Sequence, residues 1–136
     1  MLRNILGIIA GLIVGSIVNM ALVTIGPMVI PPPAGADLTT MEGLQAAMPL
    51  FETKHFVFPF LAHALGAFVG ALVACLIAAS HKMIIALVLG VLFLFGGIAA
   101  AYMIPAPMWF EALDLIVAYI PMALLGGKLA GSGKKV

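Results

Sequence analysis

The sequence has very little charge and almost no cysteine. Of its 136 residues only 8% are charged and 65% are hydrophobic, whereas an ordinary soluble domain is about a quarter charged and about half apolar. This composition excludes a water-soluble globule. The net charge of +1 is too small for an electrostatic nucleic-acid binder. The single cysteine, Cys75, excludes a disulfide framework and a cysteine-based zinc site. We therefore expect an integral membrane protein in the lipid bilayer.

Four apolar segments are long enough to cross a bilayer. A spanning helix needs about 20 apolar residues, and the predicted spans are residues 5–30, 56–80, 83–104 and 109–127. Four short β segments could not close a barrel, so only helices satisfy every backbone group in lipid. The sequence predicts an all-α, polytopic protein with a single four-helix transmembrane domain over residues 1–136. The first apolar run exceeds a signal-peptide core of roughly 7–15 residues, so we expect an uncleaved span.

Lysine and arginine are distributed asymmetrically between the two sides of the predicted bundle. Five lie on one side, and only Lys54 lies on the other; the five are Arg3, Lys82, Lys128, Lys134 and Lys135. By the positive-inside rule, both termini are then cytoplasmic and the loop 31–54 lies outside. We expect a multi-pass protein of the bacterial cytoplasmic (inner) membrane.

The connections between spans predict the arrangement of the helices. His81 and Lys82 join the second and third spans, and residues 105–107 join the third and fourth, so the spans are expected to form two antiparallel hairpins. In the outer loop, Thr39 and Glu42 have the spacing of a capping box with Thr39 as N-cap. Apolar residues follow at helical intervals, which predicts a short helix on the outer interface.

Two ridges of small residues predict close helix packing. Span one carries Gly7, Gly11 and Gly15, and span two carries Ala62, Gly66, Gly70 and Ala74. Small residues at four-residue intervals let two helix backbones approach closely in a membrane. We expect these ridges to pack span one on span two. A seam between copies of the chain is the alternative, and both uses can hold.

Polar residues inside the spans are the candidate functional groups. Asn19, His63 and Asp114 reach comparable depths below the outer surface, and Tyr119 lies one turn beyond Asp114. Polar groups inside a membrane are costly and rare. They predict either a hydrogen-bonded clamp that sets the register of spans one, two and four, or a polar, proton-linked site open to the outside. Our first expectation is the clamp.

Other features of the fourth span have simpler interpretations. Glu111 stands in the first turn, where a carboxylate stabilises the helix dipole, and we expect no catalytic role for it. Pro121 should kink the helix and free the carbonyl of Val117. No helix carries a His-x-x-Glu or His-Glu-x-x-His pattern, so we expect no metal site. We expect no cofactor either.

These features favour a protein that is not an enzyme. Our leading hypothesis is a small integral membrane protein that self-associates or serves as an accessory or structural subunit of a membrane complex. The alternative is a small transporter or channel for an organic cation or protons, with Asn19, His63 and Asp114 at its site.

Several segments carry a resemblance that covers nearly the whole chain: SIVNMALVTIGPMVIPPP, KHFVFPFLAHALG, ASHKM and PAPMWFEALDLIVAYIPMALLGGKL. With these segments the chain resembles a group of short bacterial membrane proteins with four spans. No activity is assigned to that group, so the resemblance implies the architecture alone.

Overall fold

The computed structural model describes residues 1–132, and every regular element in that range is helical. The order is α1 (Leu2–Val29), α2 (Met41–Ala47), α3 (Val57–Ile77), α4 (Lys82–Met103), α5 (Met108–Leu113) and α6 (Ile120–Gly127). Short 3₁₀ turns occupy Met48–Leu50 and Thr53–Phe56, and π-helical turns occupy Asp114–Ala118 and Lys128–Ser132. Four helical segments are long and apolar enough to cross a membrane: Leu2–Val29, Thr53–Ile77, Lys82–Met103 and Met108–Gly131. The prediction of an all-helical protein with four such helices is confirmed.

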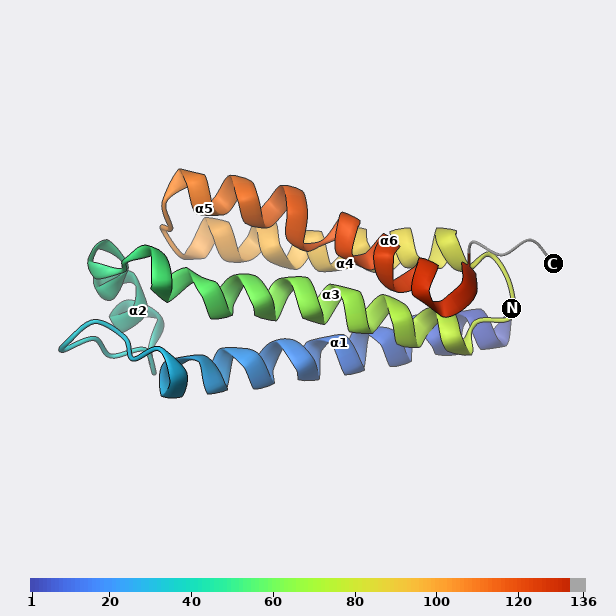
Figure 1. Cartoon of the computed structure of the whole chain (residues 1–136), viewed down its shortest axis with the longest axis horizontal. Helices are drawn as coiled ribbons and strands as arrows, with labels where there is room; N and C mark the ends of the chain where they lie inside the picture. The colour runs from blue at the N-terminus through green and yellow to red at the C-terminus, as the bar shows by residue number, and fades with distance from the viewer. Residues whose placement is uncertain (133–136) are drawn as a thin grey trace.

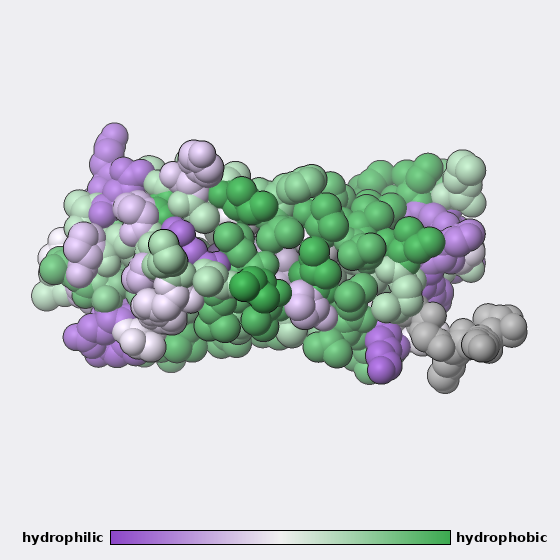
Figure 2. All heavy atoms as spheres, turned by 90° about the horizontal axis from the view of Figure 1, so that it is seen from above, coloured by the Kyte–Doolittle hydropathy of each residue, from purple (hydrophilic) through white to green (hydrophobic). Residues whose placement is uncertain are grey.

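Helix α3 is the centre of the bundle. It packs against α1 on one side and against α4 and α6 on the other, whereas α1 makes only a small contact with α4 (Figure 1). We call the end with α2 the loop end, and the end with residue 1 the N-terminal end. Polar residues gather near both ends, and apolar side chains cover the length between them (Figure 2). This distribution is the one expected of a bundle that sits across a bilayer.

The contact between α1 and α3 is made by backbone against backbone. Gly7, Gly11 and Gly15 are buried against the ridge of small residues on α3, whose members are also buried: Ala62, Gly66, Gly70 and Ala74. A Cβ atom added at Gly11 would lie 2.5 Å from the carbonyl oxygen of Gly70 and 2.8 Å from Cβ of Ala74. The predicted packing of the first span on the second is therefore present, with Gly7, Gly11 and Gly15 against Gly66, Gly70 and Ala74.

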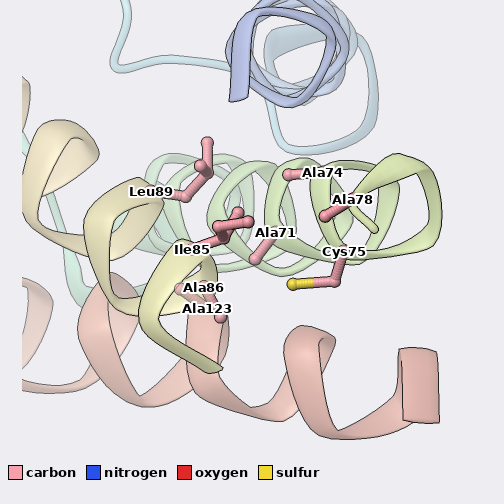
Figure 3. Close-up of a cluster of buried hydrophobic side chains, with 8 residues drawn as sticks. All are labelled: Ala71, Ala74, Cys75, Ala78, Ile85, Ala86, Leu89 and Ala123. Carbon is pink, nitrogen blue, oxygen red and sulfur yellow. The ribbon is translucent and has the colours of Figure 1, made fainter. Parts of the chain in front are cut away.

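The remaining interfaces of α3 are filled mainly by alanine. Figure 3 shows a buried cluster in which Leu89 and Ile85 of α4 reach toward α3, while Ala86 lies against Ala123 of α6. Cys75 is buried in the same cluster, and its thiol donates a hydrogen bond to the carbonyl of Lys82 at 3.1 Å. Small side chains keep these helices close, and dispersion across such contacts is a main source of helix association in lipid.

Polar side chains of α1 bind the C-terminal end of α3, which lies at the N-terminal end of the bundle. Arg3 donates from Nε to the carbonyl of Ile77 at 3.0 Å. Asn4 accepts from the amide of Ala79 at 2.9 Å and donates to the hydroxyl of Ser80 at 3.2 Å. The last carbonyls of a helix have no partner within it, and a cation there is favourable. Arg3 is therefore a capping residue at the C-terminus of α3. Lys134 and Lys135 lie outside the described residues.

At the loop end, side chains of residues 31–56 hold the chain in place through hydrogen bonds. The N-cap of α2 is Thr40, whose hydroxyl accepts from the amide of Gly43 at 3.0 Å. The prediction of Thr39 as N-cap was wrong, because Thr39 donates both its hydroxyl and its amide to Asp37. These hydrogen bonds lower the pKa of Asp37. Gln45 of α2 donates to the carbonyl of Met103 at 2.6 Å, so α2 is held against the end of α4.

Replacing Gly11 by alanine should separate α1 from α3, because the new methyl group meets backbone that cannot move aside. We expect a loss of about 1–3 kcal/mol in the free energy of unfolding, measured by denaturant titration in mild detergent. Gly96 is the matched control, since it is also helical and a Cβ there meets nothing within 4 Å. Gly96→Ala should be neutral or stabilising by up to about 1 kcal/mol. Equal losses at both positions would contradict the close α1–α3 contact.

Candidate functional site

A histidine and an aspartate meet between α3 and the fourth long helix. Nδ1 of His63 lies 2.8 Å and 2.9 Å from the two carboxylate oxygens of Asp114. The side chain of Asp114 is only 7% exposed, and that of His63 is 23% exposed. A ring nitrogen that faces a carboxylate carries the proton, so Nδ1–H of His63 donates to Asp114. The sequence expectation that these two residues lie at one depth agrees with this geometry.

Tyr119 completes the cluster through an unusual turn of helix. Its hydroxyl donates to Oδ2 of Asp114 at 3.2 Å, and its ring stacks on that of His63 with centroids 5.5 Å apart. Residues five apart on an α-helix are rotated by about 140° and do not meet. The segment Asp114–Ala118 is instead a π turn, in which each turn is wider. The wider turn brings Tyr119 back over Asp114.

The cause of the π turn is proline. Pro121 has no amide hydrogen, so a regular helix through this point would lose a hydrogen bond and clash with the preceding turn. The expected interruption occurs here: the π turn ends at Ala118, and α6 begins at Ile120. The α-helical pattern resumes with the amide of Ala123 donating to the carbonyl of Tyr119 at 2.9 Å. π turns are frequent at functional sites.

Helix α4 makes room for the tyrosine. A Cβ atom added at Gly97 would collide with the hydroxyl and the ring of Tyr119, and Tyr119 is 3% exposed. Glycine at this position therefore allows the ring to lie between α4 and His63. The cluster of His63, Asp114 and Tyr119 is called the triad below.

The triad borders a large cavity that extends toward the loop end. This large cavity has a volume of about 720 Å³ and takes its walls from α1, α3, α4, α5 and the loop. Most of the wall is apolar, and it includes Ile30, Phe56, Phe58, Ile104, Phe110 and Leu115. The titratable members are Asp37, Lys54, His55, Glu111, His63 and Asp114. The buried Asp114 and the half-buried His63 form a polar pair in an otherwise largely apolar chamber.

A small cavity of about 240 Å³ lies on the other side of His63, between α1 and α4. Its lining includes Ser16, Asn19, His63 and Tyr119. Asn19 thus shares a cavity with His63 and Tyr119, but no hydrogen bond joins it to the triad. The half-buried Asn19 packs its Cβ atom over Gly66 instead. The structure therefore brings three of the four predicted site residues together and places the fourth in an adjoining cavity.

Several polar groups around the large cavity were not predicted as site residues. Glu111 was assigned to the helix dipole; it does stand in the first turn of α5, and it also lines the large cavity. The sequence contains an indication that Glu111 lines the cavity, because Glu111 and Asp114 are three residues apart and so share a helix face. Asp37, Lys54 and His55 come from the loop, where sequence spacing indicates nothing about proximity.

The triad concentrates one uncompensated charge at membrane depth. With His63 neutral, Asp114 gives the cluster a charge of about −1, and protonation of His63 brings it to zero. A buried charge is tolerated only when hydrogen-bonded and paired. The arrangement can therefore attract a cation at the point where the two cavities meet.

A double-mutant cycle on the buried pair should be strongly non-additive. His63→Leu leaves Asp114 buried without its charge partner, which should cost roughly 2–3 kcal/mol in the free energy of unfolding. Adding Asp114→Leu removes that charge and should restore at least half of the loss. The measurement is denaturant unfolding of both single variants and the double variant. Additive losses would contradict a direct interaction between the two side chains.

Comparisons of the chain with protein-family models, with curated protein sequences and with solved structures found no match. The resemblance to short four-span bacterial membrane proteins therefore stays a prediction.

Proposed function

We propose that this protein is a small membrane transporter that binds an apolar organic cation in the large cavity. The observation that carries the proposal is the position of the Asp114–His63 pair, buried beneath largely apolar walls. Apolar walls with a few convergent polar groups are typical of small-molecule sites. A chamber of about 720 Å³ is within the usual range for such sites, roughly 300–1,000 Å³.

The negative charge of the carboxylates that line the large cavity favours binding of a cation over an anion. Asp114 lies at the depth of the buried aromatic walls, and Asp37 and Glu111 add two more carboxylates to the lining. Lys54 is the one lysine in that lining, and its charge is offset by Glu52 at 3.6 Å. Carboxylates that line an apolar cleft raise the local concentration of cations. Aromatic rings such as Phe56 and Phe110 also attract organic cations through their faces.

A proton and the organic cation would compete for the same carboxylate. Protonated His63 neutralises Asp114, and so does a cation bound beside it, so binding of the cation favours release of the proton. The charged and titratable groups near this exchange are Asp114, Tyr119, Glu111, Asp37, Lys54 and His55. The exchange would couple transport to a proton gradient.

The topology that fits this function has the loop end outside and both termini in the cytoplasm. Arg3, Lys82 and Lys128 lie toward the N-terminal end of the bundle, and this bias supports the orientation by the positive-inside rule. The four spans then form two antiparallel hairpins, α2 lies at the outer interface, and the large cavity opens to the outside. A bacterial inner membrane is the proposed location.

The hypothesis of an oligomer or an accessory subunit stays a prediction. Its main motivation was an excess of small-residue ridges, and both ridges are buried within the α1–α3 contact. The buried pair therefore favours transport over association.

Two ions of the same shape and opposite charge test the binding site. Tetraphenylphosphonium should bind saturably to the purified protein in equilibrium dialysis, and tetraphenylborate should bind at least about tenfold more weakly because it meets Asp114 with the wrong sign. Asp114→Asn should weaken phosphonium binding at least about tenfold. Glu42→Gln is the control, because Glu42 is an exposed carboxylate of α2 at the same end and does not line the large cavity.

Equal binding of the two ions, or equal weakening by both substitutions, would contradict a cation site at Asp114. Transport is measured separately with benzyltrimethylammonium, which crosses bare bilayers slowly. Proteoliposomes should take it up faster when their lumen is acidic than when no pH gradient is present. Uptake equal to that of protein-free liposomes would contradict transport while leaving the binding site in place.

A further inference from the structure

The small cavity beyond His63 contains polar groups that have no partner within the described chain. The side-chain amide of Asn19 and the hydroxyl of Ser16 line it, and neither makes a side-chain hydrogen bond among residues 1–132. His63 lines it as well, and only its Nδ1 is engaged, by Asp114. Asn19 is half-buried and Ser16 is exposed, so within a bilayer both are open to a ligand that hydrogen-bonds them.

The small cavity exists because the side chains around it are small. On α4 its wall is formed by Gly96, Gly97 and Ala100, and a Cβ atom at Gly96 would meet nothing within 4 Å. Phe93 closes the end toward the N-terminus, since its ring reaches the positions where Gly15 and Gly70 would carry a Cβ atom. The small cavity is therefore bounded by the ring of Phe93 toward the N-terminal end of the bundle and by His63 toward the loop end.

We infer that the small cavity is a second compartment of the same site and binds an uncharged hydrogen-bonding group of the ligand. This inference rests on the proposed function. His63, Gly97 and Ala100 line both cavities, so a ligand with its cation beside Asp114 can extend past the imidazole.

The chemistry of the lining defines what fits there. An asparagine amide donates and accepts, a serine hydroxyl does both, and neutral His63 with a proton on Nδ1 offers Nε2 as an acceptor. The small cavity has no carboxylate, lysine or arginine in its lining, so a charged group would be left without a counterion. A carboxamide or hydroxyl satisfies the lining and fits within about 240 Å³. The ligand class is a cation with a bulky apolar arm and a short neutral polar arm.

A matched pair of probes tests this inference. Both are quaternary ammonium ions with one phenylpropyl arm and one short arm; the short arm ends in a carboxamide in one probe and in the isosteric isopropyl group in the other. The parent protein should bind the carboxamide probe about tenfold more tightly. Asn19→Leu and Ser16→Ala together should bring the ratio of the two affinities close to one. A ratio is insensitive to partial misfolding, because an inactive fraction lowers the binding of both probes equally.

Chemical protection gives a second readout. In a Cys75→Ala background, a cysteine introduced by Asn19→Cys should react with a small methanethiosulfonate reagent, and saturating carboxamide probe should slow the reaction. A Met20→Cys variant is the control, since Met20 is 61% exposed and does not line the small cavity. Its labelling should be unaffected by the probe.

The outcomes separate this inference from the function on which it rests. Equal affinities of the two probes in the parent protein, with phosphonium binding still dependent on Asp114, would overturn the second compartment and leave the cation site intact. An affinity ratio that survives the double substitution would also overturn it. Loss of the carboxamide preference with protection of the cysteine at position 19 would support it.

Discussion

A carboxylate buried inside a helical bundle must be hydrogen-bonded by neighbouring groups, and Asp114 imposes this constraint on the rest of the structure. Its oxygens are held by Nδ1 of His63 and the hydroxyl of Tyr119. Tyr119 reaches it only through the π turn, and the π turn follows from Pro121. Gly97 is small because the tyrosine ring lies against it. The buried carboxylate thus accounts for His63 on α3 and for Tyr119, and Pro121 accounts for the break in the fourth span that brings Tyr119 to it.

The second feature that determines the structure is the packing of α1 on α3. Helices in lipid gain little from the hydrophobic effect on association, so close backbone contact must hold them. The glycines of α1 provide this contact with the backbone of α3, and from α4 only the ring of Phe93 reaches them among the described residues. Because α1 scarcely touches α4, a groove remains along α3, and both cavities lie in it. The glycines that pack α1 against α3 therefore also leave room for the two cavities.

The sequence was sufficient for features that depend on composition and period, and insufficient for those that depend on tertiary contacts. Hydropathy predicts the four long helices, and the four-residue spacing predicts the glycine contact. Counting depth from the loop end places His63 opposite Asp114. The hydrogen bond of Tyr119 could not be predicted, because an α-helix would turn it away. Thr39 and Thr40 offer the same capping chemistry, and only the position of Asp37 decides between them. The separation of Asn19 from the triad depends on how closely α1 approaches α3.

The most direct test of this account is solid-state NMR of the protein in lipid bilayers, with ¹⁵N-labelled histidine and ¹³C-labelled aspartate. The chain has three histidines and two aspartates, so the signals can be assigned by single substitutions. We predict that Nδ1 of His63 carries a proton and lies within hydrogen-bond distance of the Asp114 carboxylate, and that the ring exchanges magnetisation with water. A His63 ring that has no contact with Asp114, or a pair that no water reaches, would contradict the account.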